Sequence, residues 1–359
     1  MTLSSYDLLE QLSNIDGPSG YEWAVGSFVA RQLDGVAAVE YDNLGSVICR
    51  LDGPPGGPRI MLAAHTDEVG FMVQRITEQG YLKLSPLGGW WDQVLLAQPL
   101  RVLTSRGPVP GVLGAKPPHL VEADERAKVV ELKKMFLDVG ATDAKQAREQ
   151  FGINPGDPVV PATACTRMAN PDRLLGKAWD DRAGVAVMME TIRELSGAQS
   201  PNTVYGAGTA QEEVGLRGAQ TAVQSISPDV ALVLEVAICG DMPGIDDDVS
   251  EVKLGGGPTI YLKEGSAIPN LRLRDLAIET ARELDMPLQF SVLDRGGTDA
   301  GKIHVHAGGV PSLVLSLPAR HIHAHHGIID LNDYAQTVKL TVELVKRLDA
   351  DTVAGLLPA

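Results

Sequence analysis

Two adjacent carboxylates, Glu212 and Glu213, follow the apolar segment 203–207. At the end of a strand, adjacent side chains point in opposite directions. One carboxylate can therefore bind a metal ion while its neighbour faces the space beside it and acts as a general base on a metal-bound water. The pair predicts hydrolytic chemistry, and a solvated acidic pair is the alternative.

Three other apolar runs also end in residues that bind metals. The first ends in His65 and Asp67, the second in Asp180 followed by Asp181, and the third in Glu235. Residues two apart in a strand share a face, so Asp67 can orient His65. Asp180 can bridge two cations about 3.5–4 Å apart, whereas a helix N-cap would explain only one of the two aspartates. Glu235 at the end of an apolar run is costly unless it is paired or metal-bound.

A histidine-rich stretch, residues 320–326, supplies the last candidates. Spacing alone does not choose among its four histidines, and a loose surface tract is the alternative. With the other segments it completes the set His, Asp, Glu, Glu and His, which is the ligand set of a two-metal hydrolytic site. Zinc, cobalt and manganese all suit these ligands.

Composition excludes several functions. The 359 residues carry a formal net charge of -15, which opposes binding to nucleic acid. No run approaches the roughly 18 apolar residues of a membrane-spanning helix, and the first residues lack the pattern of a signal peptide. Three widely spaced cysteines do not form a disulfide framework. We expect a soluble cytoplasmic protein with no nucleic-acid or membrane partner.

An α/β pattern positions the candidate residues. We expect a helix that begins near Ser19, with Ser19 as its N-cap and Glu22 completing a capping box. After residue 166 the expected strands are 203–209, 230–236, 288–293 and 312–317, and the expected helices are 183–195, 271–284 and 332–348.

Residues from about 70 to 160 have a different sequence pattern, which predicts short strands separated by turns. One charged helix is expected among them, at about 129–140. This pattern indicates a small β-rich domain inserted into the α/β domain. The predicted boundaries are 1–68 and 166–359 for the α/β domain and 69–165 for the insert. The insert carries no candidate ligand, but its Trp90 and Trp91 are of the type favoured at interfaces.

Four motifs resemble those of the tetrahedral (TET), or glutamyl/deblocking, aminopeptidases, a cytosolic family of two-metal exopeptidases. They are residues 64–70, 180–184, 211–215 and 297–299. Residues 88–90, 114–119 and 155–157 extend the similarity through the insert. The resemblance implies a zinc-peptidase-like three-layer α/β/α catalytic domain. It also implies that the insert is a PDZ-like dimerisation domain, through which dimers build a twelve-subunit particle.

The resemblance further implies a function for each site residue by its position. His65 and Glu235 would bind one metal ion, Glu213 and His323 the other, Asp180 both, with Glu212 as general base and Asp67 orienting His65. Glu235 stands where many members carry Asp, and a shift of the last ligand to His321 or His325 is the alternative.

These features predict a metal-dependent aminopeptidase that removes N-terminal residues from short peptides. One alternative is an endoglucanase-type glycoside hydrolase, but its two carboxylates would flank the bond at about 5–9.5 Å, which adjacent residues fit poorly. A non-catalytic peptide-binding assembly protein is a second alternative. A deacetylase or carboxypeptidase-like amidohydrolase on the same fold is a third.

Overall fold

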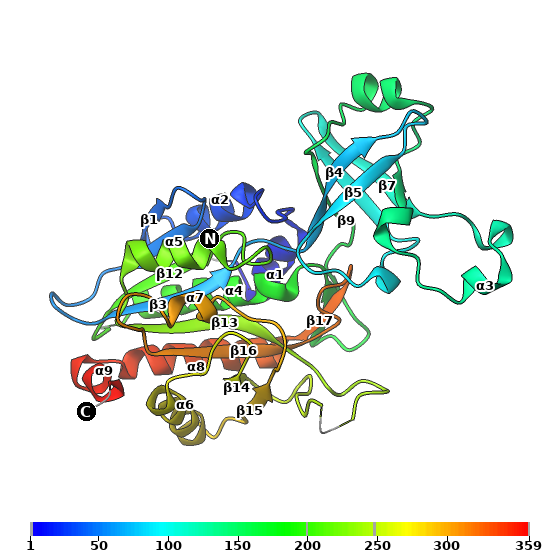
Figure 1. Ribbon diagram of the computed structural model, residues 1–359. Coiled ribbons are helices and arrows are strands. Elements are labelled where there is room, and N and C mark those ends of the chain that lie inside the picture. The colour runs from blue at the N-terminus through cyan, green and yellow to red at the C-terminus, as the bar shows by residue number, and fades with distance from the viewer. Residues whose placement is uncertain (1–2, 199, 247–248, 358–359) are drawn as a thin grey trace.

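A computed structural model describes residues 3–198, 200–246 and 249–357. The chain forms a larger α/β body, from which a smaller β-barrel projects (Figure 1). The barrel strands lie between residues 70 and 161, and the strands of the larger sheet lie before and after them. The predicted α/β class with an inserted β-rich part is therefore confirmed. The predicted boundaries 1–68, 69–165 and 166–359 stay predictions.

The α/β body is built on one eleven-stranded sheet. In spatial order its main path consists of β1 (Ala38–Tyr41), β2 (Val47–Leu51), β12 (Thr203–Thr209), β3 (Arg59–His65), β13 (Val230–Ile238), β16 (Ser312–Arg320), β17 (Gly327–Asp330), β11 (Arg173–Gly176) and β10 (Thr166–Arg167). Off this path, β14 (Thr259–Lys263) pairs with β16, and β15 (Gln289–Val292) pairs with β14. The four strands expected after residue 166 are all present.

The centre of the sheet is parallel. β3 pairs in parallel with β12 on one side and with β13 on the other, and β13 pairs in parallel with β16. His65 lies opposite Thr209, the last residue of β12. The carboxyl ends of parallel strands meet at one edge of a sheet, which is where α/β proteins place their sites. The residues that follow β3, β12 and β16 are therefore brought to the same edge.

Helices cover both faces of the sheet and give three layers (Figure 1). One face is covered by α1 (Ser5–Asn14), α2 (Trp23–Gln32), α4 (Trp179–Ser196), α6 (Leu271–Glu283), α8 (Leu331–Arg347) and α9 (Ala350–Leu356). The other is covered by α5 (Arg217–Ile226) and α7 (Ala300–Ile303). In β3, Leu62 packs in the core on the first of these faces and Met61 in the core on the other, because successive side chains of a strand point to opposite faces. No described helix is both long and apolar enough to cross a membrane.

The barrel closes on itself and has its own core. Its strands, in order around the barrel, are β4 (Gly70–Ile76), β5 (Leu82–Leu87), β8 (Phe136–Asp138), β7 (Gly107–Gly114), β6 (Pro99–Thr104) and β9 (Pro158–Pro161). Short helical turns connect them: η1 (Asp92–Val94), η2 (Pro118–Leu120), α3 (Ala123–Arg126), η3 (Leu132–Lys134) and η4 (Gln146–Gln150). Phe71, Leu100 and Leu113 are among its fully buried side chains.

Two local predictions were wrong. The charged helix expected at 129–140 is replaced by η3 and by strand β8, because Leu137 pairs with Leu82 and Leu113 and closes the barrel. The expected capping box is also absent. The helix begins at Trp23, and the buried Ser19 hydroxyl instead donates a hydrogen bond to Asp67 at 2.6 Å. In both cases a tertiary contact overrides the local pattern.

Candidate metal centre

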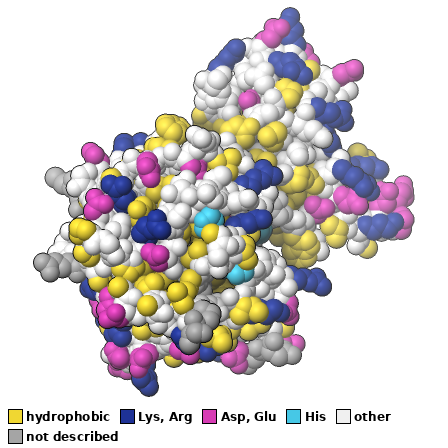
Figure 2. Space-filling view, turned by 60° about the vertical axis from the view of Figure 1, so that its left-hand side comes forward, with side chains coloured by type: hydrophobic (Ala, Val, Ile, Leu, Met, Phe, Trp, Pro, Cys, Tyr) yellow, Lys and Arg dark blue, Asp and Glu magenta, His cyan; other side chains and the backbone are white. Residues whose placement is uncertain are grey.

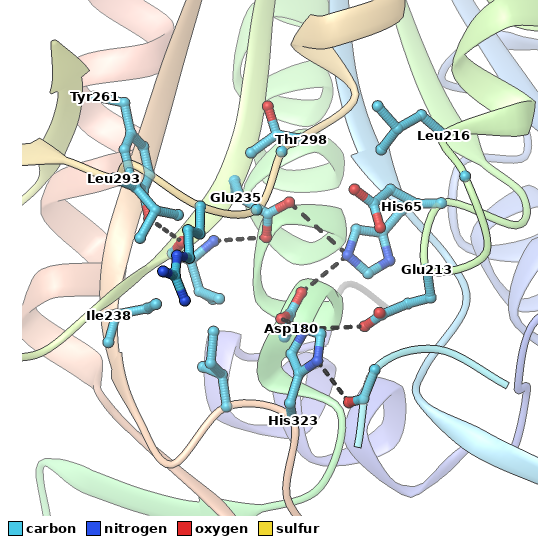
Figure 3. Close-up of a pocket in the computed structure, with 18 residues that line it drawn as sticks. His65, Asp180, Glu213, Leu216, Glu235, Ile238, Tyr261, Leu293, Thr298 and His323 are labelled. Atoms are coloured by element: carbon cyan, nitrogen blue, oxygen red, sulfur yellow. Dashed lines mark hydrogen bonds and ion pairs between the residues drawn. The ribbon is translucent and has the colours of Figure 1, made fainter. Parts of the chain in front are cut away.

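His65 is the last residue of β3 and lies buried at the carboxyl edge of the sheet. Its Nε2 atom lies 2.9 Å from Oδ1 of Asp180 and 3.8 Å from Oε2 of Glu235 (Figure 3). On the other side of the ring, Nδ1 lies 3.4 Å from Oδ1 of Asp67 and 3.2 Å from the Asp67 carbonyl oxygen. The ring is thus held between the carboxylate behind it and the two carboxylates in front.

Asp67 is fully buried and accepts hydrogen bonds from three groups. These are the Ser19 hydroxyl at 2.6 Å, the backbone N–H of Glu212 at 3.0 Å and the backbone N–H of Glu213 at 3.1 Å. With His65 beside it, these bonds lower the pKa of Asp67 even though burial alone would raise it. Asp67 therefore fixes the acidic pair as well as the imidazole.

Asp180 and Asp181 open α4 and have separate surroundings. Neither has helical dihedral angles, and a cis peptide bond joins them. Asp181 points into the body, where it accepts from the backbone N–H of His65 at 3.1 Å and of Gly184 at 3.0 Å. Asp180 faces the pocket between His65 and His323. Asp180 is the candidate ligand predicted from the sequence, and in the structure Asp181 is the one that accepts local backbone hydrogen bonds.

Glu212 and Glu213 follow β12 and both line the pocket. Oε1 of Glu213 lies 3.6 Å from Nε2 of His323. Burial, together with the negative charge of Asp180, raises the pKa of Glu213 to about 8. Burial also raises the pKa of Glu235, which is 7% exposed within β13. Both shifts follow from burial and from the neighbouring carboxylates, which disfavour a further negative charge in the pocket.

The histidine-rich stretch forms the turn between β16 and β17. Nε2 of His323 lies 3.4 Å from Oδ2 of Asp180, while its Nδ1 lies 2.7 Å from the carbonyl oxygen of Gly89 in the barrel. His325 is buried against the Trp90 ring, His326 contacts the Thr163 hydroxyl, and His321 is exposed. Of the four histidines left open by the spacing, His323 is the one that meets the carboxylates.

Two groups of potential ligands result. The His65 cluster consists of His65, Asp180 and Glu235, and the His323 cluster of Asp180, Glu213 and His323. Within each cluster the ligand atoms all lie within 4.8 Å of one another, and Asp180 belongs to both. Imidazole and carboxylate donors suit zinc, cobalt or manganese. Three carboxylates close together in a buried site repel one another unless cations offset their charge. The residues present therefore fit two divalent cations.

The clusters lie at the base of a pocket with a volume of about 630 Å³. Its remaining wall is largely apolar and includes Ile238, Tyr261 and Leu293 (Figure 3), together with Ile322. Residues 295–298 of the glycine-rich loop also line it. Figure 2 shows histidine side chains reaching the surface on one face of the α/β body, beside basic side chains and below the barrel. The arrangement suits hydrolysis of a bond in a ligand that has an apolar part.

Sequence reasoning missed three contributors to this site. Ser19 supports Asp67, Gly89 contacts His323, and Trp90 packs against the histidine turn. Only Gly89 and Trp90 had a signal, since residues 88–90 were among the motifs of the resemblance. Their contact with the centre is long-range, because 234 residues separate Gly89 from His323.

Comparison with known proteins gives concordant matches. The profile of the M42 glutamyl aminopeptidases matches residues 45–340. The lysyl aminopeptidase of Pyrococcus furiosus is 34% identical over 347 residues, which cover 96% of this chain and 97% of that protein. The TET aminopeptidase of the marine sediment archaeon Thaumarchaeota archaeon SCGC AB-539-E09 has a TM-score of 0.96 at 46% identity, covering 98% of this chain and 99% of the other.

A third match concerns assembly. The TET1 peptidase of Pyrococcus horikoshii, which can assemble into a tetrahedron or a large octahedral shell, has a TM-score of 0.86 at 31% identity. The match covers 95% of this chain and 99% of that one. The fold of this chain is thus similar to that of a single chain of a peptidase that forms large assemblies.

Proposed function

Because the chain belongs to the M42 glutamyl aminopeptidase family, we propose that this peptide hydrolase removes N-terminal residues from short peptides at a centre for two divalent cations. The observation that carries the proposal is the sharing of Asp180 between the His65 cluster and the His323 cluster. Glu212 stands on the wall of the same pocket and belongs to neither cluster.

In this proposal the two clusters hold the cations. His65 and Glu235 would hold one, Glu213 and His323 would hold the other, and Asp180 would contribute to both sites. Bound divalent cations polarise the peptide carbonyl and make a water easier to deprotonate. Zinc, cobalt and manganese all fit the donor atoms, and availability decides among them.

Glu212 is the proposed general base. Its backbone is fixed by the hydrogen bond to Asp67, and its side chain is only 8% exposed. Burial, with the nearby carboxylates Asp299 and Glu235, raises the pKa of Glu212 well above its usual range before any cation is bound. Cations in the neighbouring clusters would favour the deprotonated carboxylate, which is the form that accepts a proton. Glu212 takes a proton from the attacking water, the water oxygen bonds to the carbonyl carbon, and the C–N bond breaks. Glu212 then gives the proton to the leaving amine nitrogen.

The pocket also favours cleavage at the amino end of a peptide. In this proposal the free amino group of the peptide lies at the base of the pocket, beside the cation sites that Asp180, Glu213 and Glu235 help to form. The apolar wall receives the first side chain. We propose that the substrates are short peptides, and that the enzyme acts in the cytoplasm, where the three buried and free cysteines stay reduced.

Assembly is part of the proposal. The similarity to peptidases that form tetrahedral particles supports a homo-oligomer, with dimers assembling into twelve subunits. The barrel projects from the catalytic body and is the proposed site of subunit contact (Figure 1). The glycoside hydrolase alternative is not favoured by the family match.

The direct test compares two matched peptides, one with a free amino terminus and one with the same sequence acetylated. We expect hydrolysis of the free peptide alone, loss of that activity after exhaustive chelation, and its return with zinc, cobalt or manganese. Full activity in rigorously metal-free protein would refute the two-cation mechanism. Equal cleavage of the acetylated peptide would refute the aminopeptidase assignment.

A further inference from the structure

A segment of the barrel reaches into the centre. Residues 88–91 connect β5 to η1, and Gly89 lines the pocket. The Gly89 carbonyl oxygen accepts a hydrogen bond from Nδ1 of His323 at 2.7 Å when that nitrogen carries the proton. This is the only hydrogen bond of the His323 ring to backbone among the described residues.

The approach is close enough to require glycine. A Cβ atom on Gly88, whose φ is +80°, would lie 2.8 Å from a Val69 methyl and 3.0 Å from Oε2 of Glu213. A Cβ atom on Gly89 would lie 3.1 Å from Nδ1 of His323. The segment is therefore packed directly against two members of the His323 cluster.

Trp90 anchors this segment on both sides. Its Nε1–H donates to the carbonyl oxygen of Gly70 at 2.9 Å, and its ring stacks on Phe71 in the barrel core with 4.9 Å between centroids. The same ring also lies against His325, at an interplanar angle of 38° and again with 4.9 Å between centroids. Trp90 thus joins the barrel core to the histidine turn of the α/β body.

The histidine turn needs such support. His321 and His323 both have positive φ, at +62° and +51°, which L-residues adopt only at a cost of about 1–2 kcal/mol each. His325 is 3% exposed, and neither of its ring nitrogens has a hydrogen-bond partner in the described part of the chain. A buried imidazole without partners serves packing, and its packing partner is Trp90.

We propose that Gly89 and Trp90 are positioning residues for the His323 cluster. The Gly89 carbonyl holds the proton on Nδ1 of His323 and leaves Nε2 free for a cation, as backbone carbonyls commonly do for metal-binding histidines. The Trp90–His325 stack fixes the turn that carries the ring. The barrel thereby completes the His323 cluster, whereas the three residues of the His65 cluster all come from the α/β body. This inference rests on the proposal that both clusters bind cations.

The test is a calorimetric titration of the metal-free protein with zinc. We expect two cations for the wild type. In Trp90→Ala, affinity for one cation should fall by about 10- to 100-fold, the usual effect of removing such support, while the other is unchanged. Trp90→Phe keeps a ring in the stack and should restore most of the lost affinity.

Gly89→Ala provides a second route, because it adds one methyl group against His323 without touching the barrel core. It should weaken the same cation even if Trp90→Ala folds poorly. A double-mutant cycle identifies that cation. Trp90→Ala combined with His323→Ala should bind no more weakly than His323→Ala alone, since both changes act on one cluster.

Two controls separate positioning from general damage to the barrel. Lys145 lies in the same part of the chain with 77% of its side chain exposed, so Lys145→Ala should bind both cations normally. Leu100 is buried in the barrel core and belongs to neither the pocket lining nor the two clusters, so Leu100→Ala should lower the melting temperature without changing cation affinity.

The outcomes are distinguishable. Unchanged binding of both cations in Gly89→Ala and Trp90→Ala would overturn the inference and leave the proposed function intact. A loss in Leu100→Ala equal to that in Trp90→Ala would also overturn it, because barrel stability would then be the cause. If the wild-type protein binds only one cation in the titration, the two-cation proposal is refuted, and this inference is refuted with it.

Discussion

The Asp67 carboxylate accepts a hydrogen bond from the backbone N–H of Glu212 at 3.0 Å, and the same oxygen lies 3.4 Å from Nδ1 of His65. One fully buried side chain therefore ties a candidate ligand to the candidate general base. A change at this position acts on both functions at once.

Asp67→Asn should lower both kcat and the affinity for one cation, each by about 10- to 100-fold. The amide has one acceptor oxygen in place of two, so it cannot accept from Ser19, Glu212 and Glu213 and also face His65. Steady-state kinetics and metal titration measure the two effects. Asp52→Asn, at an exposed position, is the control. Wild-type values for both quantities in Asp67→Asn would contradict the proposed link.

The two adjacent glutamates should respond differently to the same substitution. Glu212→Gln should lower kcat by at least about 100-fold, the scale expected for a general base, and leave bound metal unchanged. Glu213→Gln should weaken metal binding, because Glu213 belongs to the His323 cluster. Kinetics and elemental analysis of both variants decide the assignment. The reverse pattern would mean that the two residues have exchanged functions.

Single changes in the histidine turn should identify the ligand. His323→Ala should lose one cation per subunit, whereas His321→Ala should retain two because His321 is exposed and outside both clusters. His325→Phe should also retain two, since it removes both ring nitrogens but keeps a ring against Trp90. Elemental analysis of dialysed protein gives the counts. Loss of a cation from His325→Phe would show that the ligand is His325.

Cation binding should depend on pH. Burial alone would lower the pKa of His323, but Asp180 and Glu213 raise it to about 10 in the cation-free protein. The ring then carries a proton at neutral pH, and a cation must displace it because only the neutral ring binds metal. Affinity for this cation should therefore rise with pH, by up to about tenfold per unit for one released proton, and level off near the pKa.

Competitive titration with a metal-sensitive dye, repeated from about pH 6 to pH 9, measures this slope. His323→Ala is the matched control, because the variant should lose this cation and with it the part of the pH dependence that belongs to His323. If the affinity for the cation of the His323 cluster does not change over this pH range, proton displacement from His323 is excluded.

The particle should be much larger than a dimer. Trp90 and Trp91 lie in the barrel, and Trp91 is exposed, which suits an aromatic anchor between subunits. Light scattering in metal-replete buffer should give a mass near twelve times 38.2 kDa. Such a particle should cleave oligopeptides but not folded proteins. A monomer with full activity would refute both the assembly and this restriction on substrates.

The sequence by itself determined which residue types stand at the ends of which strands. His65, Glu212 and Glu213 stand at the ends of apolar runs. When such runs form parallel strands, their carboxyl ends lie at one edge of the sheet. The α/β class with its β-rich insert was predictable for the same reason, since period and turn residues are local signals. Local signals failed at 129–140 and at Ser19, where contacts with distant residues decided the outcome.

Only the tertiary structure decided how the candidates lie relative to one another. Four histidines in one short stretch are equivalent in spacing, and His323 is distinguished because its turn has left-handed backbone and meets Gly89 from the barrel. Likewise, Asp180 faces the pocket and Asp181 faces the body because of the backbone geometry at the start of α4. These choices depend on contacts between segments far apart in the chain, and no local pattern of residues contains that information.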